Sequence, residues 1–377
     1  MLLQLDADLE MFRDTTERFL GEFASVEEIR RLRDHDAGFD PDYWRRGAEL
    51  GWVSLLVDEA HGGGSVSGNR LVDLSVLAHE FGRRAAPGPL ITTNIVASAL
   101  SAHDADPELL AQLLCGESVA TWAHAEGATP GAFDDLTLDI TLDGQSLVLN
   151  GQKRPVESAR VASHLLVTGL AVGGPSQVLV PADCPGVSVT PMEGVDLTRR
   201  FSVVTFDNVS VPVSAAVGEL GGAATAIDRQ LQYALIMANA EAVGAMQTGF
   251  DMTLEWALDR YSFGRPLASY QAIKHRFADM ATWLETAHAL SDEATAAAGA
   301  GSPDADELLS AAKAFIGDYG AELLQECVQF HGGIGLTFEH DLHLSLRRHT
   351  VDRALFGTPA DHRRRVAEIS IEREAAS

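Results

Sequence analysis

Basic residues and cysteines are scarce in this chain of 377 residues. It holds 28 lysines and arginines against 54 aspartates and glutamates, which gives a formal net charge of −26 at pH 7. Because a nucleic-acid footprint needs a basic face, this balance argues against a nucleic-acid-binding protein. The three cysteines, Cys115, Cys184 and Cys327, are far apart. They form neither a disulfide framework nor a paired-cysteine metal motif, so we expect a reducing, cytoplasmic setting.

Long hydrophobic runs are also missing. No stretch approaches the roughly 18 uninterrupted apolar residues of a membrane-spanning helix. The first residues, MLLQLDADLEMFRD, turn acidic at once and lack the basic and then apolar segments of a secretory signal. We therefore expect no membrane span. The apolar content of 46% is still enough for a large core, and the length favours two or three domains.

The pattern of apolar residues changes twice along the chain. Residues 1–117 carry helical spacing and predict an N-terminal helical domain. Residues 118–222 contain short β-branched runs cut by Gly, Pro, Asn and Asp, and predict a middle antiparallel β domain. Residues 223–377 return to long helical stretches and predict a C-terminal four-helix bundle. The fold class expected is therefore α+β.

The helical spacing of apolar residues, together with residues typical of helix starts and ends, predicts individual helices within these domains. In the N-terminal domain they cover residues 8–25, 40–51 and 70–89. In the C-terminal domain they cover residues 224–262, 270–298, 304–332 and 339–356.

Five motifs follow one another in a characteristic order. They are ELGWVSLLVDEAHGGGS, LVLNGQK, FDNVSVP, RYSFGRPLASYQAIKHRFADM and QFHGGIGLTFEHDLHLSLRR. By these motifs the chain resembles the acyl-CoA dehydrogenase family over essentially its whole length. The resemblance implies α,β-dehydrogenation of an acyl thioester, on CoA or a carrier protein, with FAD. It also implies a tetramer that holds each FAD between subunits, and an electron-transfer flavoprotein or similar acceptor.

The resemblance also implies which residues grip the flavin nucleotide. Arg260 offers a fixed donor fork for a pyrophosphate, and a glycine pair after QFH lets the backbone approach a diphosphate closely. The expected cofactor-binding residues are Arg260, Phe263, Gln271, Gln329, Gly332, Gly333 and Thr358.

The catalytic base of the family is missing at its usual positions. One subgroup keeps a glutamate just before the late Gly-Thr, where this chain has Phe356. A second subgroup keeps it on the first long C-terminal helix, which aligns with Ala234. Glu241 returns to nearly the same helix face about two turns later. It is therefore either a relocated catalytic base or a carboxylate paired with a cation.

The flavin-ring side of the expected site departs from the family as well. HAEGATPGAFDD, residues 124–135, replaces the usual segment, and Pro155 and Glu157 stand where relatives carry Trp and Thr. The residues expected to bind the nucleotide part of FAD are retained. Some bacterial relatives, notably in steroid side-chain breakdown, combine two different chains of this family. The sequence therefore predicts the base-lacking partner chain of an α2β2 hetero-tetramer.

Two alternatives remain open. One is a self-sufficient homotetramer that uses Glu241 or another base. The other is a non-enzymatic relative that has lost FAD, against which the retained nucleotide residues argue. His340 and His343 lie one helical turn apart but have no accompanying carboxylate or cysteine pattern, so no metal site is expected.

Overall fold

The computed structural model describes residues 5–126 and 136–376. Two compact units divide the chain between them. The helical unit comprises Met1–Val26, Leu74–Ala86 and Leu235–Ser377. The sheet unit comprises Glu27–Asp73 and Pro87–Ala234. Two helices, α4 (Arg70–Arg84) and α7 (Ala224–Asp259), begin in the sheet unit and continue into the helical unit.

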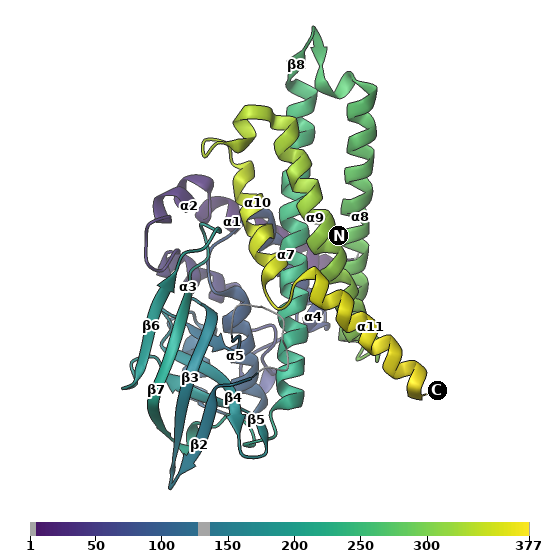
Figure 1. Cartoon of the computed structure of the whole chain (residues 1–377). Coiled ribbons are helices and arrows are strands. Elements are labelled where there is room, and N and C mark those ends of the chain that lie inside the picture. Colours follow the sequence, from purple (N-terminus) through teal and green to yellow (C-terminus); the bar gives the residue numbers. More distant parts are fainter. Residues whose placement is uncertain (1–4, 127–135, 377) are drawn as a thin grey trace. The chain divides into compact units, whose positions relative to one another are not determined.

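The helical unit is built around α9, with α8, α10 and α11 each packed along it (Figure 1). Apart from α4 and α7, its helices are α1 (Ala7–Phe23), α8 (Gln271–Gly299), α9 (Ala305–His331), η4 (Gly332–Leu336), α10 (Leu342–Ala354) and α11 (Pro359–Ala376). A hairpin of β8 (Tyr261–Ser262) and β9 (Arg265–Pro266), followed by η3 (Leu267–Ser269), connects α7 to α8.

Helices α4 and α7 cross at a very short distance because each presents a glycine to the other. A Cβ on Gly82 would lie 2.0 Å from the carbonyl oxygen of Glu241, and one on Gly244 would lie 2.2 Å from that of His79. Atoms do not approach this closely, so any larger residue would force the two helices apart. This crossing fixes the backbone of α7 where Glu241 projects.

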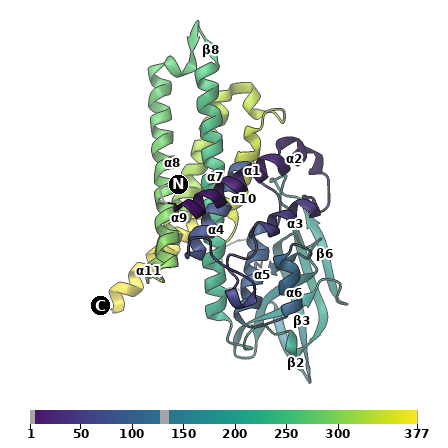
Figure 2. The same ribbon diagram turned by 180° about the vertical axis from the view of Figure 1, so that it is seen from behind.

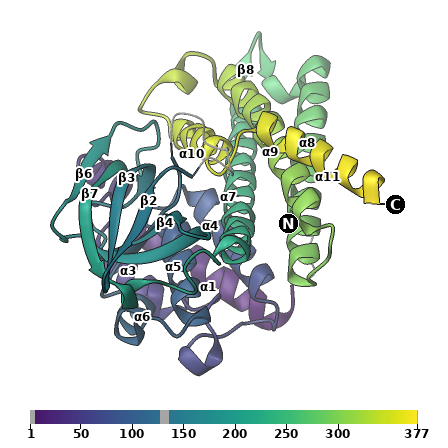
Figure 3. The ribbon, with the colours of Figure 1, turned by 60° about the horizontal axis from the view of Figure 1, so that its bottom comes forward.

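The sheet unit contains a seven-stranded sheet in the order β1-β4-β2-β3-β7-β6, with β5 paired to β4. Figure 3 shows β6, β7, β3, β2 and β4 across this sheet. The strands are β1 (Ala120–Ala123), β2 (Asp139–Asp143), β3 (Ser146–Glu157), β4 (His164–Ala171), β5 (Gly174–Pro181), β6 (Val187–Met192) and β7 (Phe201–Pro212). Its helices are α2 (Val26–Leu32), α3 (Pro41–Glu49), η1 (Glu59–His61), α5 (Leu90–Ala102), α6 (Pro107–Leu114) and η2 (Val213–Ala215).

The expected antiparallel β domain is a mixed sheet. Strand β1 runs parallel to β4 along its whole length, and β2 meets β4 in parallel at one residue pair. The remaining pairings are antiparallel. Hydrophobic periodicity reports which face of a strand is buried but not the direction of its neighbour, so the parallel pairing was not visible in the sequence.

All seven predicted helices are confirmed, and two of those that were missed, α5 and α11, escaped detection for opposite reasons. Helix α5 packs beside β1 and beside α6, as Figure 2 shows from behind. It is buried on nearly all sides, including Thr92, Thr93 and Asn94. A helix with no solvent face shows no 3.6-residue period. Helix α11 is the opposite case: it is mostly polar, and it adds a fifth long helix to the expected four-helix bundle.

Candidate functional site

Glu241 is held in an ion pair inside the helical unit. Its side chain is 1% exposed, and its Oε2 lies 3.7 Å from Nη1 of Arg348 on α10, which is equally buried. Nη2 of Arg348 donates a hydrogen bond of 2.8 Å to the carbonyl oxygen of Ala86. The contact matches the second interpretation of Glu241, a carboxylate paired with a cation. Its role in proton transfer stays a prediction.

The two usual base positions hold apolar side chains in ordered backbone. Ala234 is completely buried in α7. Phe356 lies between α10 and α11 with a φ of +58°, and its carbonyl oxygen accepts a hydrogen bond of 2.9 Å from Nε2 of His362. Since a carbonyl only accepts, Nε2 carries the proton. Burial lowers the pKa of His362 to about 4, so the ring is neutral at pH 7.

The next residue, Gly357, cannot be replaced by a larger residue without moving His362. Its φ is +108°, and a Cβ there would lie 2.6 Å from Nε2 of His362. The turn before α11 is thus fixed by the backbone itself.

Thr358 begins α11 as a helix cap. Its hydroxyl donates to Oδ2 of Asp361 at 2.5 Å, its backbone N–H donates to the same oxygen at 3.0 Å, and the N–H of Asp361 donates back at 3.3 Å. This is a reciprocal capping box. Burial alone would raise the pKa of Asp361, but the hydrogen bonds from Thr358 outweigh it and hold the pKa below its usual range. The hydroxyl proton of Thr358 is therefore already used within the chain.

The RYSFG segment places its aromatic ring in solvent. Phe263 is 96% exposed, and it forms the β8–β9 turn together with Gly264, at φ angles of +51° and +82°. Two positive φ angles are typical of a type I′ hairpin turn, which favours Asn and Gly. A Phe in this conformation costs on the order of 1–2 kcal/mol. Arg260, also exposed, lies at the start of the hairpin, with its guanidinium carbon 5.7 Å from the centre of the Trp256 ring.

Other predicted cofactor residues gather at the same end of the helical unit. Gln271 is the first residue of α8 and Gln329 lies in the last turn of α9; both are exposed. Gly332 ends α9 at a φ of +63°, and a Cβ on it or on Gly333 would meet nothing within 4 Å. The indole N–H of Trp256 donates to the carbonyl oxygen of Phe330 at 3.2 Å and joins α7 to α9 here.

Six predicted residues thus lie at one end of the helical unit, and Thr358 does not. The 13 residues of α10 separate η4 from the turn before α11, and an α-helix of this length spans about 20 Å.

The sheet unit gives Glu157 a partner that the sequence did not reveal. Glu157 is buried, and its Oε1 accepts a hydrogen bond of 2.9 Å from Nε of Arg199. Its negative charge is therefore balanced within the unit. Pro155 follows Arg154 through a cis peptide bond in β3. Residues 127–135 of the HAEGATPGAFDD segment lie outside the described residues.

A second buried pair adjoins these residues. Nζ of Lys153, the lysine of NGQK, pairs with Glu126 and donates to the carbonyl oxygen of His124 at 2.9 Å. Burial lowers the pKa of Lys153 to about 8. Sequence reasoning missed this pair because its members are 27 residues apart. The sequence did offer one hint of a buried charge, because Lys153 lies in a segment whose residues otherwise alternate between apolar and polar.

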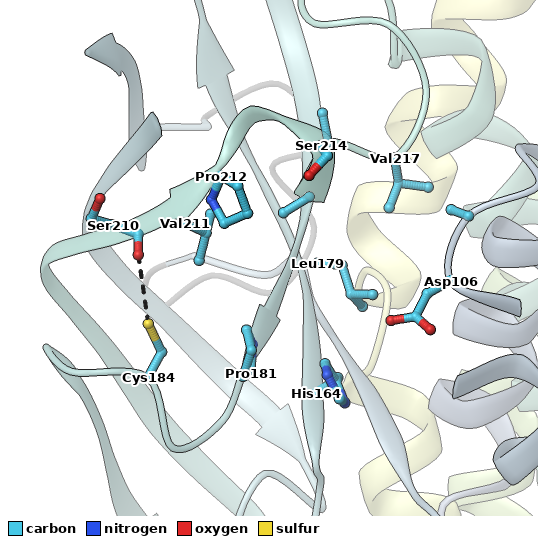
Figure 4. Close-up of a pocket in the computed structure, with 13 residues that line it drawn as sticks. Asp106, His164, Leu179, Pro181, Cys184, Ser210, Val211, Pro212, Ser214 and Val217 are labelled. Atoms are coloured by element: carbon cyan, nitrogen blue, oxygen red, sulfur yellow. Dashed lines mark hydrogen bonds between the residues drawn. The ribbon is translucent and has the colours of Figure 1, made fainter. Parts of the chain in front are cut away.

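The predicted site residues do not line the pocket drawn in Figure 4. That pocket of 390 Å³ lies in the sheet unit, and its lining includes His164, Asp106 and Cys184. Figure 4 shows the thiol of Cys184 directed at Ser210, whose carbonyl oxygen accepts from it at 3.8 Å.

Neither a metal cluster nor a membrane span is found in the part of the chain that the structure describes. Residues 5–126 and 136–376 contain no group of three or more His, Cys, Asp or Glu side chains that could hold a metal ion. His340 instead packs with its ring centre 4.4 Å from that of His331. Over the same residues, no helix has both the length and the apolarity to cross a membrane.

Two family models match the sequence. Residues 6–114 match the N-terminal domain of acyl-CoA dehydrogenase, and residues 215–371 match its C-terminal domain. Among curated relatives, acyl-CoA dehydrogenase IpdE2 of Mycolicibacterium smegmatis is 28% identical over 363 residues, which cover 96% of this chain and 98% of that protein.

Solved structures share the fold over nearly the full length. A variant of the Tcur3481–Tcur3483 steroid ACAD is 26% identical with a TM-score of 0.86, covering 98% of this chain and 99% of that one. Butyryl-CoA dehydrogenase from Megasphaera elsdenii is 19% identical with a TM-score of 0.88, covering 98% and 100%. At 19% identity, the second match supports a shared fold and nothing more.

Proposed function

This chain belongs to the acyl-CoA dehydrogenase family, and we propose that within it the chain is the base-lacking partner subunit of an α2β2 acyl-CoA dehydrogenase. The observation that carries the proposal is Phe356. It occupies the position before Gly357-Thr358 where many relatives keep the base, and a phenyl ring cannot accept a proton. The hydrogen bond from His362 and the positive φ of Gly357 hold this turn in place.

The environment of Glu241 supports the same proposal. A base must reach the substrate proton in the reacting geometry. Glu241 is 1% exposed and paired with Arg348, which is itself anchored to Ala86. Freeing this carboxylate would leave a guanidinium buried without its counter-charge.

The residues fit the nucleotide half of FAD better than its ring. When bound, the flavin would accept the hydride from the β carbon of the acyl thioester. The exposed guanidinium of Arg260 suits a pyrophosphate, and the open backbone of Gly332 and Gly333 allows close approach. On the ring side, Pro155 offers no flat face and Glu157 is committed to Arg199. This asymmetry favours a chain that completes a partner's FAD site.

The relatives bear on substrate and partner. The Tcur3481–Tcur3483 protein is a steroid ACAD, and its name joins two components. We extend both features to this chain: a second acyl-CoA dehydrogenase-like chain as partner, and a bulky acyl-CoA thioester of steroid type as substrate. An electron-transfer flavoprotein or similar acceptor, and a cytoplasmic setting, complete the proposal.

Counting flavins tests the assembly. The chain is co-expressed with a second acyl-CoA dehydrogenase-like chain of the same organism, and the flavin per tetramer is measured by absorbance. We expect two flavins per hetero-tetramer, and neither flavin nor acyl-CoA oxidation for the isolated chain. Four flavins in an active homotetramer would establish the self-sufficient enzyme instead. Absence of flavin from every assembly would establish the non-enzymatic alternative.

A variant separates the roles of Glu241. In the hetero-tetramer, Glu241→Gln keeps turnover per bound flavin within about twofold, because the base belongs to the partner chain. If Glu241 is the base, turnover falls by a factor of 10² or more.

A further inference from the structure

A smaller pocket of the sheet unit combines aliphatic walls with unused polar groups. It has a volume of 280 Å³ and lies between the end of α5 and the first turns of α7. Small side chains leave the space open: Ala99 and Ala102 come from α5, and Ala226 comes from α7. Both helix segments belong to the sheet unit, so the pocket is complete within it.

Five polar side chains of the lining are not engaged within the chain. Within the described residues, no side-chain hydrogen bond or ion pair is made by Ser98, His103, Thr225, Arg229 or Tyr233. Hydroxyl and guanidinium groups that converge on one cavity are usually satisfied by one another, by water or by a ligand. All of them line one pocket, and Thr225 and Arg229 are exposed, so a ligand in this pocket would meet unused donors.

Gln230, another polar residue of the lining, is hydrogen-bonded within the chain. The amide of Gln230 donates to Gln177 at 2.9 Å and accepts from it at 2.7 Å. This reciprocal pair engages one N–H group and the carbonyl oxygen of the buried amide.

The charges near Tyr233 leave one cation uncompensated. Arg229, Arg70 and Asp58 are the charged groups that act on its phenol. Arg70 is paired with Asp58 at 2.7 Å, whereas Arg229 forms no ion pair within the described residues. Burial raises the pKa of Tyr233, so the phenol stays protonated and able to donate. A positive spot lined by donors is an exception in a chain with a net charge of −26.

We propose that this pocket binds a small organic carboxylate with a short apolar body. The guanidinium of Arg229 presents two parallel N–H groups, which match the two oxygens of a carboxylate. The hydroxyls of Tyr233 and Thr225 add donors, and the alanine walls accept the apolar body. A phosphate dianion fits less well, because Arg229 is the one permanently charged cation of the lining and Asp58 lies nearby.

Benzoate is a suitable probe for the full-length protein. Saturation-transfer NMR and calorimetry are expected to show binding of benzoate in the millimolar range or tighter, and neither benzamide nor inorganic phosphate should displace it. Arg229→Gln should weaken benzoate binding about tenfold or more, because it removes a charge-assisted hydrogen-bond pair. Tyr233→Phe should weaken it less.

Arg160→Gln is the matched control. Arg160 is another exposed arginine of the sheet unit, paired with Asp36 at 2.7 Å, and its replacement should leave benzoate binding unchanged. The proposal is overturned if benzoate does not bind, if it binds Arg229→Gln equally well, or if benzamide competes equally. Stronger binding of phosphate than of benzoate would also overturn it, since the site would then select phosphate.

Discussion

At the scale of single residues, three buried ion pairs stand out. Lys153 pairs with Glu126, Glu157 with Arg199, and Glu241 with Arg348. Each pair removes two charges from water, and the attraction repays that cost only while both partners are present. The carboxylates that the sequence marked as chemically interesting are, in the structure, halves of such pairs.

The Glu241–Arg348 pair gives a prediction that stability measurements can check. Glu241→Gln or Arg348→Met alone should lower the free energy of unfolding by about 3–5 kcal/mol, because each leaves a buried charge uncompensated. The double variant Glu241→Gln/Arg348→Met should lose less than either single variant. Urea unfolding of all three, together with wild type, measures the coupling energy.

A surface arginine provides the control for that cycle. Arg353 is 45% exposed and lies 2.9 Å from Asp318. Arg353→Met should change the free energy of unfolding by less than about 1 kcal/mol, as exposed ion pairs usually do. Additive losses in the cycle would show that Glu241 and Arg348 do not depend on each other.

At the scale of elements, helix ends and turns carry the candidate site. The turn before α11 combines a left-handed Phe356, an obligatory Gly357 and the Thr358 cap. The β8–β9 turn combines a left-handed Phe263 with Gly264. In both turns an aromatic residue stands where Asn or Gly would be easier to accommodate.

The Thr358 cap can be tested on α11 itself. Thr358→Ala should destabilise α11 by about 1 kcal/mol, since it removes both the hydroxyl donor and the acceptor of the capping box. Hydrogen exchange should therefore quicken for the first amides of α11. Thr358→Ser keeps the hydroxyl and should exchange like wild type. Equal exchange in both variants would mean that the cap contributes nothing.

The β8–β9 turn separates stability from assembly. Phe263→Asn should leave the isolated chain as stable or up to about 1 kcal/mol more stable, because Asn tolerates a positive φ. In the hetero-tetramer it should lower flavin content, because the exposed ring is proposed to contact the partner's nucleotide. Ile371→Asn, which replaces a side chain of 65% exposure on α11, should leave flavin content unchanged.

At the scale of the whole molecule, buried histidines set the response to acid. Burial lowers the pKa of His124 and His288 to about 3, and that of His349 and His362 to about 4. Below pH 6.5 the unfolded chain binds protons that the folded chain does not. Stability is therefore full above about pH 6.5 and falls as the pH drops toward these folded values.

The decrease in the free energy of unfolding per pH unit can be predicted. Each of the four histidines contributes about 1.4 kcal/mol per pH unit between its unfolded and folded pKa values. Urea unfolding at pH 7.5, 6.5 and 5.5 measures the slope while most carboxylates remain ionised. His362→Gln should make the slope shallower by one proton. A free energy of unfolding independent of pH over this range would contradict the prediction.

The sequence by itself determined the family and the α–β–α order of its parts. Motifs such as RYSFG and QFHGG are local, and local patterns of apolar residues, glycine and proline follow from neighbouring positions in the chain. The helices 8–25, 40–51 and 304–332 were found for this reason. The sequence also showed that the two usual positions of the catalytic glutamate hold Ala234 and Phe356.

The tertiary structure decided which residues meet. The pairing of Glu241 with Arg348 joins positions 107 residues apart (348 minus 241), and the parallel pairing of β1 with β4 depends on a partner strand. Neither leaves a periodic signal, because contacts between distant segments are fixed by packing of the whole unit. The sequence showed that the base positions are empty, and only the fold showed that Glu241 is held by a buried arginine.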